Sequence, residues 1–429
     1  MPVTVDPATK MTKDRLSDQG VPYCASRSHS PGEGGVVAKK KTRGWTQAGA
    51  ARAAREARIA TIDFLAHAPI ARGWHLNRLV SAYQVHETHT GSRDAAAALL
   101  FGGMGYRPPY PRTWAETVEM VLTDEARHLT EADLYVLSPQ MCDVVVAAAE
   151  SLTIEDLRLV DPDDLPSPTG LVVLPHPLVT TAVGGELSDL RAFAWRTPAA
   201  HILPVRHGGG LQEDPAVRMS SFHDTHGPVR PDSFLEFAAL ARARGTPLPP
   251  LLLDAGRCLP FRSGRESSPE ALDRFVAAAR QTVARHRQLR QAQGFDEDRV
   301  VGEYTPGGAL VDADDSLMPR FLYAFWRLCE QRIAEMDVAE VNHSAQVLAD
   351  RAGVSPQVRV VRLRRIDQPR AGHGQGRDWQ HRWVVRMHRV RQWYPSEQRH
   401  KVIYRGPYLK GPDDKPLIGG TTTVRSLVR

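Results

Sequence analysis

The chain of 429 residues has few cysteines and no long apolar run. Its four cysteines stand at positions 24, 142, 258 and 329, too far apart for a CxxC metal motif and too few for a disulfide framework. No window approaches the roughly 18 apolar residues that cross a bilayer, and the N-terminus lacks the apolar core of a signal peptide. We therefore expect a soluble, cytoplasmic protein with reduced thiols and no membrane partner.

Recognisable catalytic and cofactor motifs are also missing. The glycines at 208–210 lack the Gly-Lys-Ser/Thr end of a phosphate-binding loop, and the chain has neither GxSxG nor a strand-linked GxGxxG. His223 and His226 are three residues apart, whereas a zincin helix needs four, and the Gly-Pro pair that follows ends any helix. We interpret residues 207–232 as a long polar loop and expect no metal and no cofactor.

Acidic residues are scarce at one end of the chain. The formal net charge is +6, but residues 357–429 contain 17 lysines and arginines against 5 acids, whereas the rest contains 38 against 44. Clustered positive charge of this kind is typical of a protein that binds a polyanion, either nucleic acid or an acidic membrane surface. The basic character therefore belongs to the C-terminal part.

Composition and periodicity organise the remainder. Residues 1–44, with scattered Pro, Gly and Ser, predict a disordered tail. Helical and strand-like patterns alternate beyond it. Helices are expected at 46–101, 113–160, 268–294 and 314–336, and strands at 170–179 and 190–206. The fold class is therefore mixed α/β (α+β), with a helical N-terminal region and a central sheet with two long helices forming a body over residues 45–340.

A small basic β-rich module is expected over residues 356–429. Trp383, Val385 and Met387 alternate with polar or basic residues, and the same period of two recurs around residues 401–405. YPSEQ and KGPDDKP predict turns between these strands. The segment VRVVRLRR at 358–365 alternates in the same way, so we expect it to supply another strand of the module, with a basic face.

The cations and aromatic residues of this module predict nucleic-acid binding. The guanidinium fork of arginine pairs with phosphate, and aromatic rings stack on unpaired bases. RNA is favoured over lipid because the segment lacks a basic amphipathic helix. The expected phosphate contacts are Arg382, Arg386, Arg389, Arg391, Lys401, Arg405 and Lys410. The expected base or ribose contacts are His388, Trp393, Tyr394 and Tyr408. Trp383 and Trp393 could instead form the core of the small sheet.

Two stretches near the C-terminus, RQWYPS at 391–396 and PYLKGPDDKPL at 407–417, carry a family resemblance. With Arg386, His388, His400 and Ile403, they resemble proteins of actinobacteria and of their phages and plasmids. These are related to the type V-A anti-CRISPR inhibitor, which lowers production of the type V CRISPR effector nuclease. DDLPSPTGLVVLPHPLV at 163–179 is similar to the central strands of that family.

The resemblance implies an RNA-associated regulator of a mobile genetic element or its host. Such a protein engages a nascent polypeptide or a ribosome-associated target and depletes its message. Two alternatives remain open. Residues 344–365 could form a helix-turn-helix of a DNA-binding repressor, although VRVVRLRR has the period of a strand. His388 and His400, beside Lys401, could cleave RNA without metal, one imidazole acting as base and the other as acid.

Overall fold

The computed structural model describes residues 44–204, 210–262, 269–301, 309–364, 380–394, 399–412, 415–418 and 424–425. Apart from Gly44, the tail expected at 1–44 lies outside the described residues. So do parts of the two turns expected in the C-terminal module, at 395–398 and 413–414. No helix in the described part of the chain combines the length and hydropathy needed to cross a membrane.

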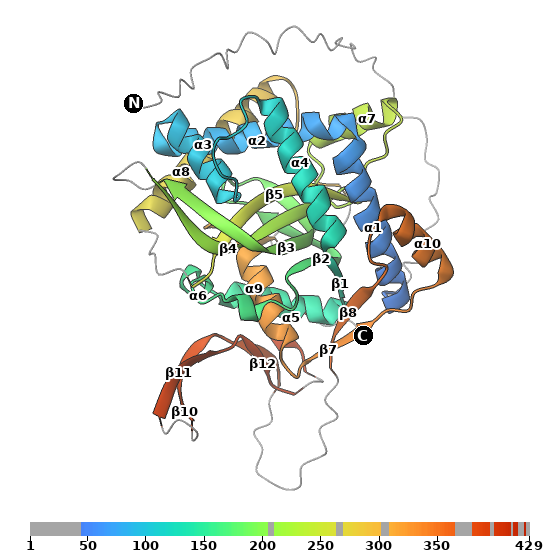
Figure 1. Cartoon of the computed structure of the whole chain (residues 1–429), viewed down its shortest axis with the longest axis vertical. Coiled ribbons are helices and arrows are strands. Elements are labelled where there is room, and N and C mark those ends of the chain that lie inside the picture. Colours follow the sequence, from blue (N-terminus) through green and yellow to red (C-terminus); the bar gives the residue numbers. More distant parts are fainter. Residues whose placement is uncertain are drawn as a thin grey trace.

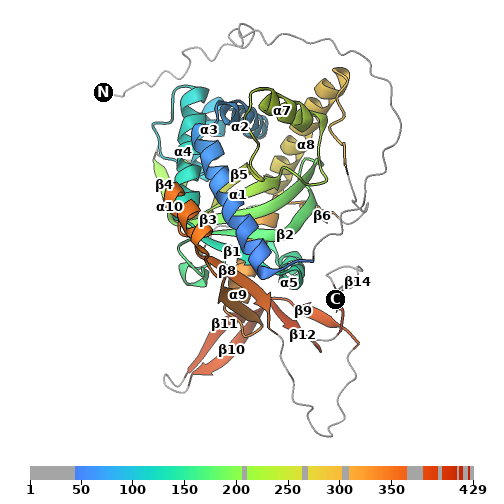
Figure 2. The same ribbon diagram turned by 90° about the vertical axis from the view of Figure 1, so that its right-hand side faces the viewer.

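A mixed sheet with helices on both faces forms the body, which confirms the expected α/β fold class (Figures 1 and 2). Its strand order is β5-β4-β3-β2-β1-β8-β7, and β6 pairs with β2. The strands are β1 (Asp133–Leu137), β2 (Thr169–Thr181), β3 (Leu187–Pro204), β4 (Leu211–Asp224), β5 (Leu251–Pro260), β6 (Leu310–Val311), β7 (Ala334–Val338) and β8 (Val358–Leu363). β2 to β5 form an antiparallel meander, whereas β1 pairs in parallel with both β2 and β8.

The helices divide between the two faces of this sheet. α1 (Gln47–His67), α2 (Pro69–Thr90), α3 (Arg93–Gly103) and α4 (Trp114–Glu131) share one core with the sheet, and α5 (Pro139–Ser151) and α9 (Leu317–Cys329) share the other. The remaining helices are α6 (Ile154–Leu157), η2 (Pro162–Asp164), α7 (Asp232–Ala243), α8 (Pro269–Ala292) and α10 (His343–Ala352). Strand β1 shows why both cores form, because Leu134 and Val136 face one layer while Tyr135 and Leu137 face the other.

Local sequence fixes many of the helix bounds. The hydroxyl of Thr46 accepts from the amide of Gly49 at the start of α1, and Thr113 forms a reciprocal capping box with Glu116 at the start of α4. α9 buries Phe321, Phe325 and Trp326 against the sheet, as its apolar spacing predicts.

The prediction of a polar loop at 207–232 is wrong, because β4 occupies residues 211–224. Val217 and Met219 pack into the core shared with α5 and α9, while Arg218 and Ser220 are buried on the opposite face. These two polar side chains hydrogen-bond to acidic residues of α4, which compensates for their burial. The strand therefore has a polar composition although it lies inside the sheet.

The segment VRVVRLRR does not join the C-terminal module. β8 lies in the central sheet between β1 and β7, with Val358 and Val360 buried. Arg359 donates to Asp133 at 2.7 Å, and Arg362 forms an ion pair with Asp337. The basic face expected on this strand is therefore neutralised by acidic side chains of neighbouring strands, and the body extends to β8.

The prediction of a helix-turn-helix at 344–365 is wrong for residues 344–364, which the structure describes. α10 ends at Ala352, its C-cap Gly353 has a left-handed φ of 66°, and the chain then enters β8 instead of a second helix. The turn is held from α1, where Arg55 donates to the carbonyl of Pro356 at 2.6 Å and Arg58 donates to that of Ser355. These arginines therefore stabilise the body and do not form a solvated phosphate-binding face.

Candidate nucleic-acid interface

The C-terminal module is β-rich, as expected, and consists of a small sheet and a two-stranded ribbon. The sheet has the order β12-β9-β13-β14, formed by β12 (Tyr408–Lys410), β9 (Arg382–Val385), β13 (Leu417–Ile418) and β14 (Val424–Arg425). The ribbon pairs β10 (His388–Tyr394) with β11 (Arg399–Arg405). It extends away from the helices and the central sheet (Figure 1).

Apolar contacts attach the module to the body. Leu417 is buried in the core that contains α5 and α9, and Val384, Met387 and Leu409 pack against the same core. The amide nitrogen of Gln331 also donates to the carbonyl of Pro407 at 2.8 Å. The small sheet is therefore anchored, while the ribbon leaves it at the edge of the body.

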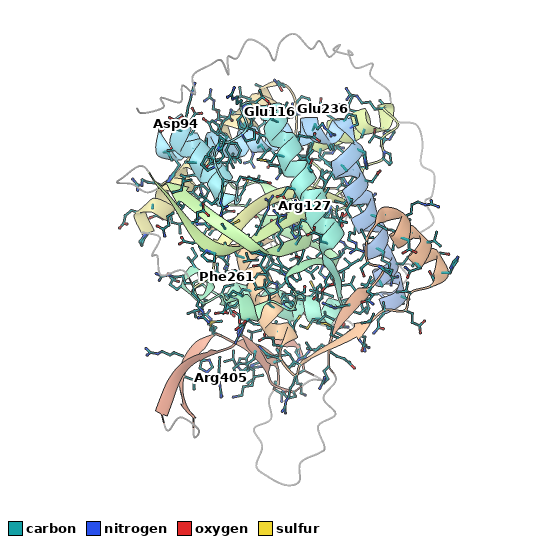
Figure 3. All side chains as sticks on the ribbon, viewed as in Figure 1. Asp94, Glu116, Arg127, Glu236, Phe261 and Arg405 are labelled. Carbon is teal, nitrogen blue, oxygen red and sulfur yellow. The ribbon has the colours of Figure 1, made fainter. Side chains whose placement is uncertain are left out.

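Exposed cations gather where the ribbon meets the small sheet. Arg386 and Arg389 are exposed, and within the described ranges neither makes an ion pair. Arg405 is exposed at the end of β11 (Figure 3), where its backbone pairs with that of His388. Lys410 is exposed, with Nζ 5.9 Å from the centre of the Trp383 ring. These four side chains are therefore open to solvent on the surface of the module.

Arg382 differs from the other predicted phosphate contacts. Its side chain retains only 3% exposure, and Nε donates to the carbonyl of Lys415 at 3.0 Å. It joins β9 to the segment before β13. This arginine is a structural part of the module, so the prediction that it contacts phosphate at the surface is wrong.

The described aromatic residues lie partly inside the module. Tyr408 is half-buried, with its ring centre 6.2 Å from that of His388, whose Nδ1 lies 3.0 Å from the carbonyl oxygen of Arg386. Trp383 is also half-buried and meets the ring of His381 edge-on at 5.8 Å. His388 is exposed beside the cations, whereas the placement of Trp383 fits the alternative that it belongs to the core of the small sheet.

Five predicted site residues have side chains outside the described part of the structure: Arg391, Trp393, Tyr394, His400 and Lys401. Their backbones are described, and the antiparallel register sets Trp393 opposite His400 and Gln392 opposite Lys401. The proposed roles of these side chains therefore stay predictions.

The backbone register argues against His388 and His400 as a catalytic pair. His388 lies opposite Arg405, whereas His400 lies opposite Trp393, so five positions separate the two histidines along the ribbon. At about 3.4 Å per residue, this corresponds to about 17 Å. A backbone separation of this size argues against the two histidines acting together on one phosphodiester.

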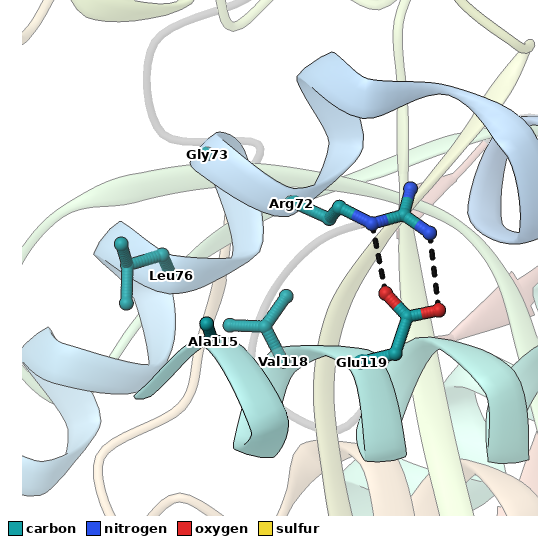
Figure 4. Close-up of a pocket in the computed structure, with 6 residues that line it drawn as sticks. All are labelled: Arg72, Gly73, Leu76, Ala115, Val118 and Glu119. Atoms are coloured by element: carbon teal, nitrogen blue, oxygen red, sulfur yellow. Dashed lines mark hydrogen bonds and ion pairs between the residues drawn. The ribbon is translucent and has the colours of Figure 1, made fainter. Parts of the chain in front are cut away.

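Metal and small-molecule sites are poorly represented in the described residues. None of their His, Cys, Asp and Glu side chains form a group of three or more that could hold a metal. A pocket of about 320 Å³ lies between α2 and α4, lined by Arg72, Gly73, Leu76, Ala115, Val118 and Glu119 (Figure 4). Arg72 donates to Glu119 through Nε at 2.8 Å and Nη2 at 3.0 Å. This bidentate ion pair satisfies the charged groups of the pocket.

Comparison with known proteins finds no family that matches the chain, and no similar curated protein or solved structure. The resemblance of the C-terminal stretch to the anti-CRISPR inhibitor family therefore stays a prediction.

The sequence interpretation missed a buried charge cluster between α4 and the sheet. The carboxylate of Asp124 accepts from Arg196 at 2.6 and 2.9 Å, and from Arg218 at 2.6 Å. Burial would raise its pKa, but the arginines lower it to about 2. Beside it, Glu125 accepts from Ser220 at 2.9 Å and contacts His128 at 3.2 Å. The available signal was the position of Asp124 and Glu125 on the apolar face of an amphipathic helix.

Proposed function

We propose that the C-terminal module binds RNA and that the chain is an RNA-associated regulator. The observation that carries the proposal is the exposed pair Arg386 and Arg389, which make no ion pair among the described residues, at the base of a projecting ribbon. Guanidinium groups without a carboxylate partner attract phosphate oxygens and form charge-assisted, bidentate hydrogen bonds with them.

The arginines of the body support this proposal by contrast. Arg257 donates to Asp315 at 2.7 Å, and Arg327 donates to Asp164 at 2.7 Å. Arg218 lies between Asp124 and Glu125, at 2.6 and 3.7 Å. In each of these three cases an acidic side chain accompanies the arginine. Arg386 and Arg389 have no such partner among the residues that the structure describes, so their charge is available to an external one.

Single-stranded RNA is the polyanion that suits this surface best. The seven residue pairs of the ribbon span about 20 Å, with His388 and Tyr408 beside the cations at its base. Stacking of a base on an aromatic ring contributes about 1–3 kcal/mol. The major groove of an RNA duplex is too narrow for side chains, whereas that of B-DNA admits a two-stranded ribbon. Duplex DNA is therefore the main competing ligand.

The regulatory part of the proposal rests on the resemblance at 386–417. A regulator of this kind binds a messenger RNA and lowers its amount, while it engages a nascent polypeptide or another ribosome-associated target. The setting is the cytoplasm of a cell that carries a mobile genetic element. Binding, and not catalysis, is the role of the module, because the two candidate histidines lie far apart on the ribbon.

A binding titration of the full-length protein tests the proposal. Fluorescence anisotropy would compare single-stranded RNA with duplex DNA of equal length at several salt concentrations. We expect tighter binding to RNA, with an affinity that falls steeply as salt rises. Tighter binding to duplex DNA, or no binding to either polymer, would show the proposal to be wrong. A truncation at Ser355 is unsuitable, because it removes β8 from the central sheet.

A further inference from the structure

A chain of hydrogen bonds joins three polar side chains on adjacent strands of the central sheet. Ser188 lies near the start of β3, His223 near the end of β4, and Asp254 on β5. Oγ of Ser188 lies 3.1 Å from Nδ1 of His223, and Nε2 of His223 lies 2.9 Å from Oδ1 of Asp254. The neutral imidazole can therefore donate from Nε2 to the carboxylate and accept the serine hydroxyl at Nδ1.

The carboxylate that orients the imidazole is itself fixed. Ser221 donates to Oδ2 of Asp254 at 3.0 Å. Arg78 of α2 donates from Nε to the backbone carbonyl of Asp254 at 3.1 Å and forms an ion pair with its carboxylate. These contacts hold Asp254 in one orientation, so the acceptor for the imidazole N–H is in place before any ligand arrives.

The three residues are surrounded by protein and yet accessible to solvent. Burial, and then the charge of Arg78, lowers the pKa of His223 to about 3, so the ring is neutral at pH 7. At the same time, the side chain of His223 retains 19% exposure, that of Asp254 16% and that of Arg78 36%. The chain of hydrogen bonds is therefore desolvated and yet still reached by water.

We propose that Ser188, His223 and Asp254 form a hydrolytic site for small carboxylic esters, separate from the RNA-binding module. A serine bonded to an imidazole, whose other nitrogen is bonded to a carboxylate, is the arrangement that activates a hydroxyl as a nucleophile. Such a site is defined by the geometry and roles of its side chains and not by their order in the sequence. The guanidinium of Arg78 pairs with the carboxylate of Asp254 and so adds positive charge to the site on the Asp254 side of the imidazole.

The reaction needs only the ester and water. Oγ of Ser188 bonds to the carbonyl carbon while its proton passes to Nδ1 of His223. The bond from that carbon to the leaving oxygen then breaks, and the leaving alkoxide takes the proton from Nδ1. A water molecule next gives a proton to Nδ1 and adds to the acyl carbon. Release of the carboxylic acid returns the proton to Ser188, so no oxidant, reductant or metal is consumed.

A second serine–histidine pair provides a matched control. Oγ of Ser81 lies 3.4 Å from Nδ1 of His286, but Nε2 of His286 lies 2.7 Å from the amide oxygen of Gln84 and not from a carboxylate. Ser81 is half-buried like Ser188. Because an amide cannot stabilise an imidazolium as a carboxylate does, Ser81 is expected to remain unreactive.

Labelling of the full-length protein with a fluorophosphonate probe tests the proposal. Peptide mapping by mass spectrometry should find one adduct, on Ser188. Ser188→Ala should abolish labelling, and Ser81→Ala should leave it unchanged. His223→Gln and Asp254→Asn should each slow labelling by about a hundredfold or more. Thermal unfolding of each variant shows whether it folds.

The wild-type protein alone can refute the proposal, without any variant. Folded wild-type protein that takes up no probe, or takes it up on another residue, would overturn it. So would a folded His223→Gln variant that reacts at the wild-type rate. These results do not depend on RNA binding, so failure of this site and failure of the proposed function are distinguishable.

Discussion

Replacing Arg386 and Arg389 together by alanine should weaken RNA binding and reduce its dependence on salt. Both side chains are exposed and make no ion pair in the described part of the chain. Their loss should therefore leave the fold intact. The double variant removes two positive charges at the base of the ribbon, where we place phosphate contacts.

The expected magnitude follows from counterion release. Each phosphate contact with a single strand contributes about 0.7 to the slope of log K against log salt. Removal of two contacts should therefore lower the magnitude of the slope by about 1.4. At 0.1 M salt this corresponds to about 25-fold weaker binding, and the difference should vanish near 1 M.

Anisotropy titrations at four or more salt concentrations measure both quantities. Arg244→Ala/Arg285→Ala is the charge-matched control, because both arginines are exposed on the body, far along the chain from the module. An equal loss of slope in this control would mean that the net charge of the protein, and not the ribbon, governs binding. An unchanged slope in the Arg386→Ala/Arg389→Ala variant would refute the assignment of these residues to phosphate.

Two further predictions concern the body. Asp124→Asn should lower the free energy of unfolding by about 3–5 kcal/mol, because it leaves Arg218 buried with less compensating charge. Urea denaturation measures this free energy, and a loss below about 1 kcal/mol would contradict the prediction. Burial raises the pKa of Asp189 to about 7, despite the hydrogen bond from the amide of Val229. The folded state therefore loses stability as the pH rises from 3.8, the pKa of this group in the unfolded chain, through about 7. Asp189→Asn should therefore stabilise the protein more at pH 8 than at pH 5, by on the order of 1–4 kcal/mol. Equal shifts of the urea midpoint at the two pH values would show that the ionisation of Asp189 does not destabilise the folded state.

The elements that the sequence predicts well are those whose signal is local. The apolar residues of α9 recur at helical spacing, and the capping box of Thr113 and Glu116 marks the start of α4. The fold class follows from the alternation of such helices with apolar strands. Short-range periodicity and capping determine these elements, so a single stretch of sequence is enough to recognise them.

The elements that the sequence predicts poorly depend on distant partners. β4 is polar in composition, and only the acidic residues of α4 make it a buried strand. β8 has the alternation of a half-exposed basic strand, but Asp133 and Asp337 neutralise its arginines. Pairing between such remote segments leaves no trace in either segment alone.

For the candidate site, the sequence located the exposed cations of the ribbon but could not distinguish Arg382, which is buried, from its neighbours. It also could not show that His388 and His400 are offset by the register of the ribbon. A sequence period gives the face of a residue within one strand, whereas register is a relation between two strands.

The position of β8 has a consequence for synthesis of the chain. β1 is flanked by β2 on one side and β8 on the other, and the hydroxyl of Tyr135 meets Arg359, which lies 224 positions later. At about 5–20 residues per second, a ribosome needs roughly 11–45 s to make the intervening segment. During that interval one edge of β1 has no partner strand. The sheet therefore cannot be completed until β8 itself has left the ribosome.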